Sequence, residues 1–281
     1  MTMDNWLVIS NCQTYGFANC LQAQVSDALV NGVDVLLFTS DPETYASKVH
    51  EADILFISAE IREALIPLGM AEDKPWVDLP MFTFRAYHPD LTYIKHGGDL
   101  VSGPTNHYHS AIAFACFKAG LSESDTLRHF NRDFFDSCGY FGIWSAERDR
   151  LVSEVLKTGV DISEPIRRWG RESAFMYSIN HPKIRVLYDI STELIKLQGK
   201  KPVSGVMPHD NLTSGPHFSV YPEIAETLGV TGSYVFKDHE SYRPFNLEHF
   251  IYGSFDVYRK YDPDGFEPHQ HVDHIASIIR G

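Results

Sequence analysis

The stretch ISNCQ at residues 9–13 places one thiol between two amide side chains. An apolar run, WLVI, precedes it and a helix-like pattern follows, so Cys12 is expected where a strand gives way to a helix. Ligands of open α/β sheets bind beyond the carboxyl ends of the strands. The N-terminus of the following helix would lower the pKa of the thiol and so favour a nucleophilic thiolate. The amides of Asn11 and Gln13 would help to bind an oxyanion during acyl transfer.

A nucleophilic cysteine needs a base, and a distant segment, PHDNLTSGPHFSVYPEIAETLG at 208–229, supplies a candidate. His217 stands in its Gly-Pro loop, before a helix predicted to start near residue 219 or 220. Asp210 is close enough in sequence to orient the imidazole, which would complete a nucleophile, a base and an orienting group. The alternatives are a small buried core residue at Cys12 and a surface histidine in a turn at His217.

Strands and helices must bring these residues together. Apolar runs at 5–10, 33–38 and 53–58 predict strands, and a fourth strand is possible at 81–84. A helix face repeats every four residues, at Phe17, Leu21, Val25 and Leu29. Strands that alternate with helices of this length predict an α/β fold with a parallel sheet. Helical patterns dominate later, so we expect a single domain over 1–281 with a helical insertion at roughly 106–200.

The composition narrows the class of protein. The 281 residues carry a formal net charge of -13, which argues against nucleic acid as the main partner. No secretory signal and no apolar run of roughly 20 residues stand out, so no membrane span is expected. The four cysteines form no CxxC pair, which favours a reduced, cytoplasmic protein. The histidines at 107–109 and 269–274 lack further ligands at diagnostic spacing, so no metal is expected.

Several segments together resemble the WcbI-type polysaccharide biosynthesis family. They are ISNCQ, the central block YHPDLTYI…LVSGPTNHYHSAIAFACFKAGLSESDTLRHFN…FFDSCGYFGIW, and the later PHFSVYPEIAETLGV. The resemblance extends from Trp6 to about Val230. It implies an SGNH-hydrolase-like, three-layer α/β fold that binds coenzyme A or acetyl-CoA. It also implies an O-acetyltransferase acting on a capsular or other surface polysaccharide, or on its sugar precursor.

Within this resemblance Cys12 takes the place of the serine that follows the first strand in the SGNH pattern. His217 matches the late histidine, but Ser214 replaces the expected aspartate three residues earlier, and Phe218 replaces a proline. A Cys12–His217 dyad is therefore expected, and Asp210, a backbone carbonyl or no group at all would orient the imidazole.

The central block would supply the binding residues. His88 would donate to a carbonyl or a phosphate, and Asp90 would hold a hydroxyl; the alternative is a turn with a capping aspartate. The segment 106–110 is predicted to open a helix whose N–H groups suit a phosphate of coenzyme A, with core packing as the alternative. The residues expected to contact coenzyme A are Asn106, Tyr108, His109, Ser110, Asn180 and His181.

Two other function classes remain open. An esterase or thioesterase would use the same dyad with water as the acceptor. A non-catalytic module that binds coenzyme A or a glycan would suit the aromatic content of 13%.

Overall fold

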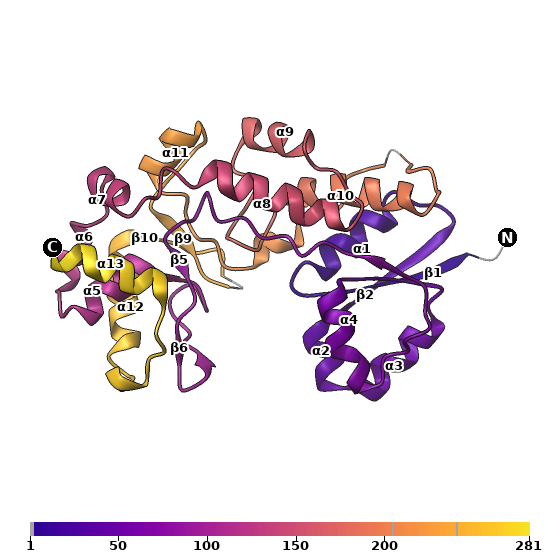
Figure 1. Cartoon of the computed structure of the whole chain (residues 1–281), viewed down its shortest axis with the longest axis horizontal. Helices are drawn as coiled ribbons and strands as arrows, with labels where there is room; N and C mark the ends of the chain where they lie inside the picture. Colours follow the sequence, from indigo (N-terminus) through magenta and orange to yellow (C-terminus); the bar gives the residue numbers. More distant parts are fainter. Residues whose placement is uncertain (1–2, 204, 240) are drawn as a thin grey trace. The chain divides into compact units, whose positions relative to one another are not determined.

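A four-stranded parallel sheet organises the first part of the chain in this computed structural model, which describes residues 3–203, 205–239 and 241–281. The strands are β1 (Asp4–Ser10), β2 (Ala28–Asp34), β3 (Ile54–Ile57) and β4 (Trp76–Asp78), in the spatial order β2-β1-β3-β4 (Figure 1). The order reverses direction at β1, as in doubly wound folds. An α/β fold with a parallel sheet is therefore confirmed.

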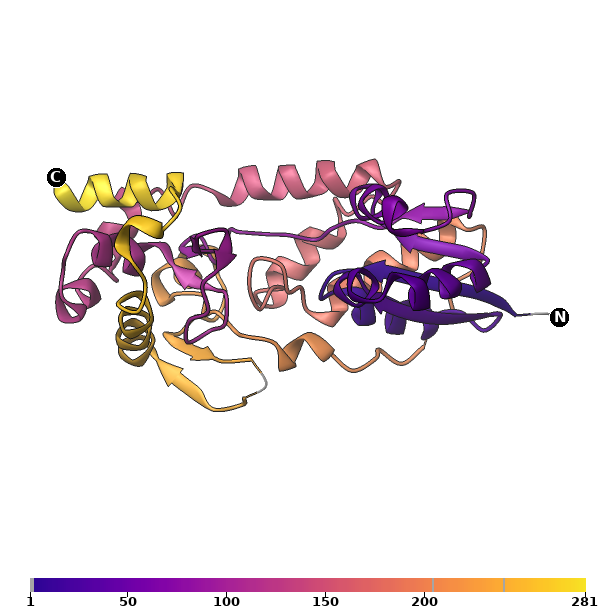
Figure 2. The same cartoon turned by 90° about the horizontal axis from the view of Figure 1, so that it is seen from below.

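Helices cover both faces of this sheet. On one face Leu7 and Ile9 of β1 join a buried cluster with α2 (Val35–Ser40), α3 (Pro42–Glu51) and α4 (Ala59–Leu65). On the other face lie α1 (Thr14–Gln22) and α10 (Ile184–Leu197) (Figure 2). A Cβ added to Gly16 of α1 would come within 2.5 Å of Leu187 of α10, so the glycine permits their close packing. Since both faces are covered, the central residues of β1 (Trp6–Ile9) and all residues of β3 are apolar.

Three predicted elements are wrong in their bounds. The run at 33–38 is not a strand, because the Asp34 carboxylate accepts a hydrogen bond from Leu36 N (2.8 Å) and starts helix α2 there. The helix from Phe17 ends at Gln22, and Leu29 belongs instead to β2, which pairs with β1 over its whole length. No strand forms at 81–84; the fourth strand is β4, earlier in the chain.

The chain divides into two compact units. Unit 1 comprises Met1–Thr83, Asp149–Trp169 and His181–Leu212, and unit 2 comprises Phe84–Arg148, Gly170–Asn180 and Thr213–Gly281. The helices of the predicted insertion at 106–200 are shared between the units.

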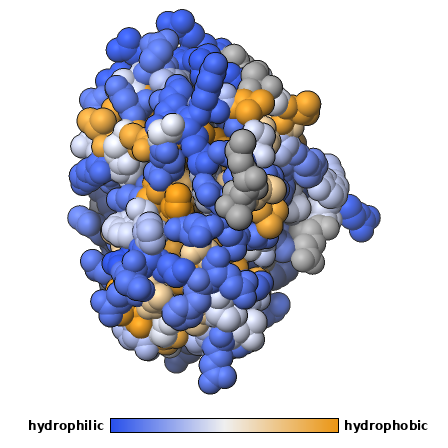
Figure 3. Space-filling view, turned by 90° about the vertical axis from the view of Figure 1, so that its right-hand side faces the viewer, coloured by the Kyte–Doolittle hydropathy of each residue, from blue (hydrophilic) through white to orange (hydrophobic). Residues whose placement is uncertain are grey.

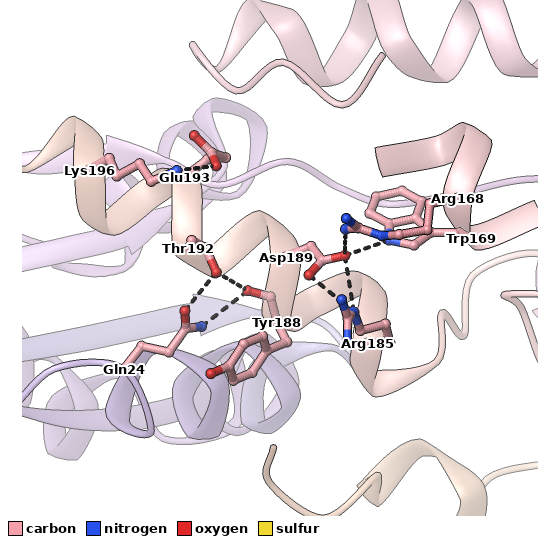
Figure 4. Close-up of polar contacts among 9 residues, drawn as sticks. All are labelled: Gln24, Arg168, Trp169, Arg185, Tyr188, Asp189, Thr192, Glu193 and Lys196. Atoms are coloured by element: carbon pink, nitrogen blue, oxygen red, sulfur yellow. Dashed lines mark hydrogen bonds and ion pairs between the residues drawn. The ribbon is translucent and has the colours of Figure 1, made fainter. Parts of the chain in front are cut away.

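Unit 1 is tied together by polar contacts around α10. Asp189 of α10 accepts hydrogen bonds from Arg168 (2.6 Å) and Trp169 (2.8 Å) of α9 (Pro165–Glu172). On the side toward α1, the Thr192 hydroxyl donates to the side-chain oxygen Oε1 of Gln24 at 2.6 Å (Figure 4). These contacts bind the helices that follow residue 149 to the sheet built by the first 83 residues.

Unit 2 is mainly helical, with short antiparallel strand pairs. Its helices are α5 (Ala111–Lys118), α6 (Glu123–Leu127), α7 (Arg132–Ser137), the first part of α8 (Trp144–Lys157), α11 (Pro222–Leu228), α12 (Leu247–Tyr258) and α13 (Gln270–Arg280). The pairs are β5 (Leu91–Thr92) with β8 (His109–Ser110), β6 (Lys95–His96) with β7 (Asp99–Leu100), and β9 (Val235–Lys237) with β10 (Pro244–Asn246). Single 3-10 turns occur at Ile66–Leu68, Asn211–Ser214 and Pro263–Gly265.

No described helix has both the length and the apolar character required to cross a bilayer. The face drawn in Figure 3 is mostly hydrophilic, and its hydrophobic residues lie in small separate groups.

Candidate active site

Cys12 lies at the carboxyl end of the first strand, as predicted. Strand β1 ends at Ser10, and helix α1 begins at Thr14 after a turn in which the Thr14 N–H donates to Asn11 O (2.9 Å). The thiol is partly buried and all four cysteines are reduced. The turn at the end of a parallel strand is the usual place for ligand chemistry in such sheets.

The two amides that flank the thiol hold this turn in place. Asn11 Oδ1 accepts from Gln13 N (3.1 Å) and lies 3.7 Å from Cys12 Sγ, so it also accepts from the thiol. Asn11 Nδ2 lies 3.9 Å from Met81 Sδ, and Gln13 Nε2 donates to Phe82 O at 2.8 Å. Both amides thus join the end of β1 to the segment that follows β4. An oxyanion-binding role for either amide stays a prediction.

The thiol of Cys12 does not show the lowered pKa that its position led us to expect. Burial raises its pKa to about 12, and the nearby Asp34 carboxylate adds to the increase. A helix N-terminus stabilises a negative charge by about 0.3–1 kcal/mol, which is less than one pKa unit. An increase of about three units from burial and Asp34 therefore outweighs the helix. The resting thiol is protonated at neutral pH.

Asp210 and His181 both belong to unit 1, near the start of α10. Asp210 Oδ2 accepts from the Ile184 N–H at 2.9 Å, so the carboxylate satisfies a donor in the first turn of that helix. His181 is 6% exposed and precedes the same helix. The segment 178–183 lies between α9 and α10. Asp210 and His217 fall in different units.

Asp90 forms a fully buried polar centre in unit 2. Its carboxylate accepts from Tyr221 (2.6 Å), Tyr140 (3.0 Å) and Ile112 N (2.9 Å), and also from the Ser110 hydroxyl. Burial raises its pKa, and these four donors oppose the increase. Because the protein itself supplies these donors, the geometry favours a structural role over the predicted binding of a substrate hydroxyl.

His88 is a buried, neutral histidine beside His217. Burial lowers its pKa to about 3, and the proximity of the His217 ring contributes in the same direction. No hydrogen bond of good geometry reaches either ring nitrogen of His88 from the described residues, and the Phe218 backbone opposes part of the decrease in its pKa. Buried polar atoms without partners are uncommon, which makes His88 a candidate for contact with a ligand.

His217 lies in an extended segment rather than directly before a helix. Its backbone exchanges hydrogen bonds with Lys237 of β9 (2.9 and 3.1 Å), and its half-buried ring packs edge-on against Tyr177. Helix α11 begins only at Pro222, later than predicted. Strand pairing therefore fixes the backbone of this histidine.

The segment 106–110 does not open a helix as predicted. Asn106 has a φ of 56°, the left-handed conformation that asparagine tolerates, so it forms a turn. Ser110 caps helix α5 through a hydrogen bond from Ala113 N (2.9 Å). The N–H groups of the first turn of α5 therefore lie four to five residues later than expected.

Tyr108 and His109 make internal contacts. The Tyr108 hydroxyl donates to Asn180 Oδ1 (2.5 Å) and accepts from Ser178 (3.1 Å). His109 is fully buried between Tyr258 OH and Val101 O, at 3.0 and 2.9 Å, and burial lowers its pKa to about 4. Its contribution is therefore to packing in unit 2, while contact of these residues with coenzyme A stays a prediction.

The predicted residues thus form separate groups within each unit. In unit 1 the thiol and its two amides are adjacent, and Asp210 and His181 lie at α10. In unit 2 His88 neighbours His217, Ser110 neighbours Asp90, and Tyr108 neighbours Asn180. Sequence reasoning missed Tyr140 and Tyr221, because they lie 50 and 131 residues from Asp90 and no local motif connects them. Among the described residues no group of three His, Cys, Asp or Glu side chains could hold a metal.

The chain is similar to one known protein family in sequence and to one solved structure in fold. The family model described as "Polysaccharide biosynthesis enzyme WcbI" matches residues 5–202. A solved structure of WcbI, described as "a novel polysaccharide biosynthesis enzyme", aligns with a TM-score of 0.72 and 14% identity. The alignment covers 99% of this chain and 94% of that one. That structure is described as native protein without the disulfide bond between coenzyme A and one of its cysteines. None of the curated proteins matches the chain.

Proposed function

This chain belongs to the family of the polysaccharide biosynthesis enzyme WcbI, and from that premise we propose that it is a coenzyme A-dependent O-acetyltransferase. Its acceptor is a hydroxyl of a surface or capsular polysaccharide, or of the sugar precursor. The observation that carries the proposal is the position of Cys12, at the carboxyl end of β1 and beside the start of α1. The description of the solved WcbI structure, which names coenzyme A and a disulfide bond between it and a cysteine that this native form lacks, supports it.

An SGNH-like arrangement of the site is part of the proposal. The sheet order β2-β1-β3-β4 and the turn after β1 are compatible with that pattern, in which the nucleophile follows the first strand. A thioester such as acetyl-CoA can exchange its acyl group with a second thiol at little free-energy cost, since one thioester replaces another. Cysteine in the nucleophile position therefore suits a thioester donor.

The protonated thiol makes a base necessary. At a pKa of about 12, forming the thiolate at pH 7 would cost about 7 kcal/mol, so the proton must leave as the new bond forms. We assign the base to His217, with His88 as its neutral neighbour. In the first step Cys12 Sγ attacks the acetyl carbonyl, His217 takes the thiol proton, and coenzyme A leaves as a thiol with that proton. In the second step the sugar hydroxyl attacks the acetyl-cysteine, and its proton returns through His217 to the Cys12 sulfur.

A non-catalytic module that binds coenzyme A is the second candidate. The raised pKa of Cys12 is the observation that favours it, since a buried and protonated thiol is a poor nucleophile without help. An esterase or thioesterase would use the first step as above and water in the second.

The test measures release of coenzyme A from acetyl-CoA, with and without a sugar acceptor, in the wild type, Cys12→Ala, His217→Ala and the double variant. Residues that act as one unit give losses that do not multiply. We expect each single variant to lose a factor on the order of 10² to 10⁴ in turnover, and the double variant to lose little more. The control is Cys138→Ala, which alters the other partly buried cysteine.

The outcomes separate the candidates. Acceptor-dependent release supports acetyl transfer, whereas release without an acceptor indicates a thioesterase. Stabilisation of the fold by coenzyme A without any turnover indicates a binding module. Losses that multiply would mean that Cys12 and His217 act independently.

A further inference from the structure

A cavity of about 240 Å³ opens at the carboxyl ends of β3 and β4 within unit 1. Ser58 directly follows β3, Asp78 is the last residue of β4, and the last turn of α8 closes the other side. Strands β3 and β4 are parallel and pair Ile57 with Asp78, so both strand ends meet at this edge. The edge is the one at which open α/β sheets bind their ligands, and none of the predicted site residues described above lines the cavity.

The segment after β4 connects this cavity to Cys12. Met81 lines the cavity and also contacts the Asn11 amide, at 3.9 Å. The next residue, Phe82, accepts a hydrogen bond from the Gln13 amide. Of the two amides that flank the thiol, Asn11 therefore contacts a residue of the cavity wall, and Gln13 contacts the residue that follows it, within the same unit.

The charges of the lining disfavour anionic ligands. Glu60, Asp78 and Glu154 line the cavity together with Lys157, so carboxylates outnumber ammonium groups three to one. Arg150 pairs with Glu154 at 2.5 Å, so three carboxylates stand against two cations and the formal charge near the cavity stays negative. A phosphate or carboxylate would meet repulsion here, whereas hydroxyl groups can donate to Asp78 and accept from Lys157.

The shape of the lining favours a small ring. Leu79 and Pro80 are buried and, with Met81 and Val155, present an apolar wall between the polar groups. Pockets for drug-sized ligands measure roughly 300–1,000 Å³, so a cavity of about 240 Å³ suits one sugar ring rather than a chain of them. Asp78 accepts from Ala59 N through Oδ1 (3.2 Å), which orients its carboxylate.

We propose that this cavity is the acceptor subsite and binds one neutral sugar ring, with Asp78 and Lys157 as the residues that recognise its hydroxyls. The inference rests on the proposed acetyl transfer and assigns its acceptor a place and a size. Acetyl-CoA, which carries phosphates, binds elsewhere.

The test is saturation-transfer NMR with the methyl glycopyranosides of glucose, galactose, mannose and N-acetylglucosamine as probes. We compare the wild type with Asp78→Asn, which keeps the Oδ1 acceptor for Ala59, and with Lys157→Met, which keeps the apolar stem. Asp41→Asn is the matched control, because Asp41 also accepts from a helix N–H in unit 1 (Thr44 N, 3.3 Å) but lies outside the cavity. Loss of one hydrogen bond to a charged group should weaken binding of the sugar about tenfold.

The proposal stands if at least one sugar binds, both cavity variants weaken it about tenfold and the control does not. It is overturned if no sugar of the set binds the folded wild type, or if Asp78→Asn and Lys157→Met bind as the wild type does. In turnover assays the same variants should raise the KM for the sugar about tenfold and leave the KM for acetyl-CoA unchanged. If the variants transfer acetyl groups with an unaltered KM for the sugar, the subsite is refuted and the proposed function stands. If the sugar binds but no acetyl transfer occurs, the proposed function is refuted and the binding site stands.

Discussion

The reactivity of Cys12 toward a disulfide reagent tests how burial and the helix terminus compete at the site. Burial and Asp34 raise the pKa of the thiol from 9.0 to about 12. Three pKa units reduce the thiolate fraction at neutral pH about 10³-fold. A more basic thiolate is also more nucleophilic, by a factor of roughly 20 for this difference. We therefore expect Cys12 to react about 50-fold more slowly at pH 7.5 than a model thiol of ordinary pKa.

The assay follows the absorbance released from 5,5′-dithiobis(2-nitrobenzoate) by the Cys138→Ser protein, and subtracts the rate of Cys12→Ser/Cys138→Ser. In this background the other two cysteines are buried. The rate of Cys12 should rise about tenfold per pH unit up to pH 10 or beyond, since the thiolate fraction does so below the pKa. Asp34→Asn, which keeps the cap on α2, should raise the rate less than unfolding in urea does, because burial is the larger cause.

A rate that levels off below pH 9, or that exceeds the model thiol at neutral pH, would refute this reasoning. It would mean that the helix N-terminus, and not burial, sets the pKa of Cys12. The thiol would then be able to attack without a base, and the role assigned to His217 would be unnecessary.

Two predictions concern the polar core of unit 2. Tyr221→Phe removes a hydrogen bond of 2.6 Å to the buried Asp90 carboxylate, and should lower the free energy of unfolding by about 1.5–3 kcal/mol in urea titrations; an unchanged midpoint would contradict the role given to Asp90. The pKa of His109 is about 4 in the folded protein and 6.5 in the unfolded chain, so between pH 4 and pH 6.5 the protein takes up a proton when it unfolds. The free energy of unfolding therefore falls as the pH is lowered through this range. His109→Asn should therefore reduce the slope of stability against pH there by up to about 1.4 kcal/mol per pH unit, and an identical slope in both proteins would show that His109 is not buried in its neutral form.

Local sequence determined the elements whose signal lies within a few residues. The run WLVI gives β1, because a strand covered on both faces is apolar throughout, and the turn that carries Cys12 follows from its end. Helix α10 ends before Gly199 and α11 before Gly229, both with positive φ as the C-cap pattern predicts. The combination of motifs also indicated the family, which the family model supports over residues 5–202.

Tertiary structure decided what depends on residues distant in sequence. Pairing of β2 with β1 shifted the second strand away from the predicted 33–38 and left Asp34 to cap a helix. The pKa of Cys12 follows from burial, which no local pattern encodes, and it reversed the direction expected from the helix terminus alone. The donors to Asp90 come from residues up to 131 positions away. The pKa and the hydrogen bonds of a buried group depend on all its neighbours in space, whereas a sequence motif contains only its neighbours in the chain.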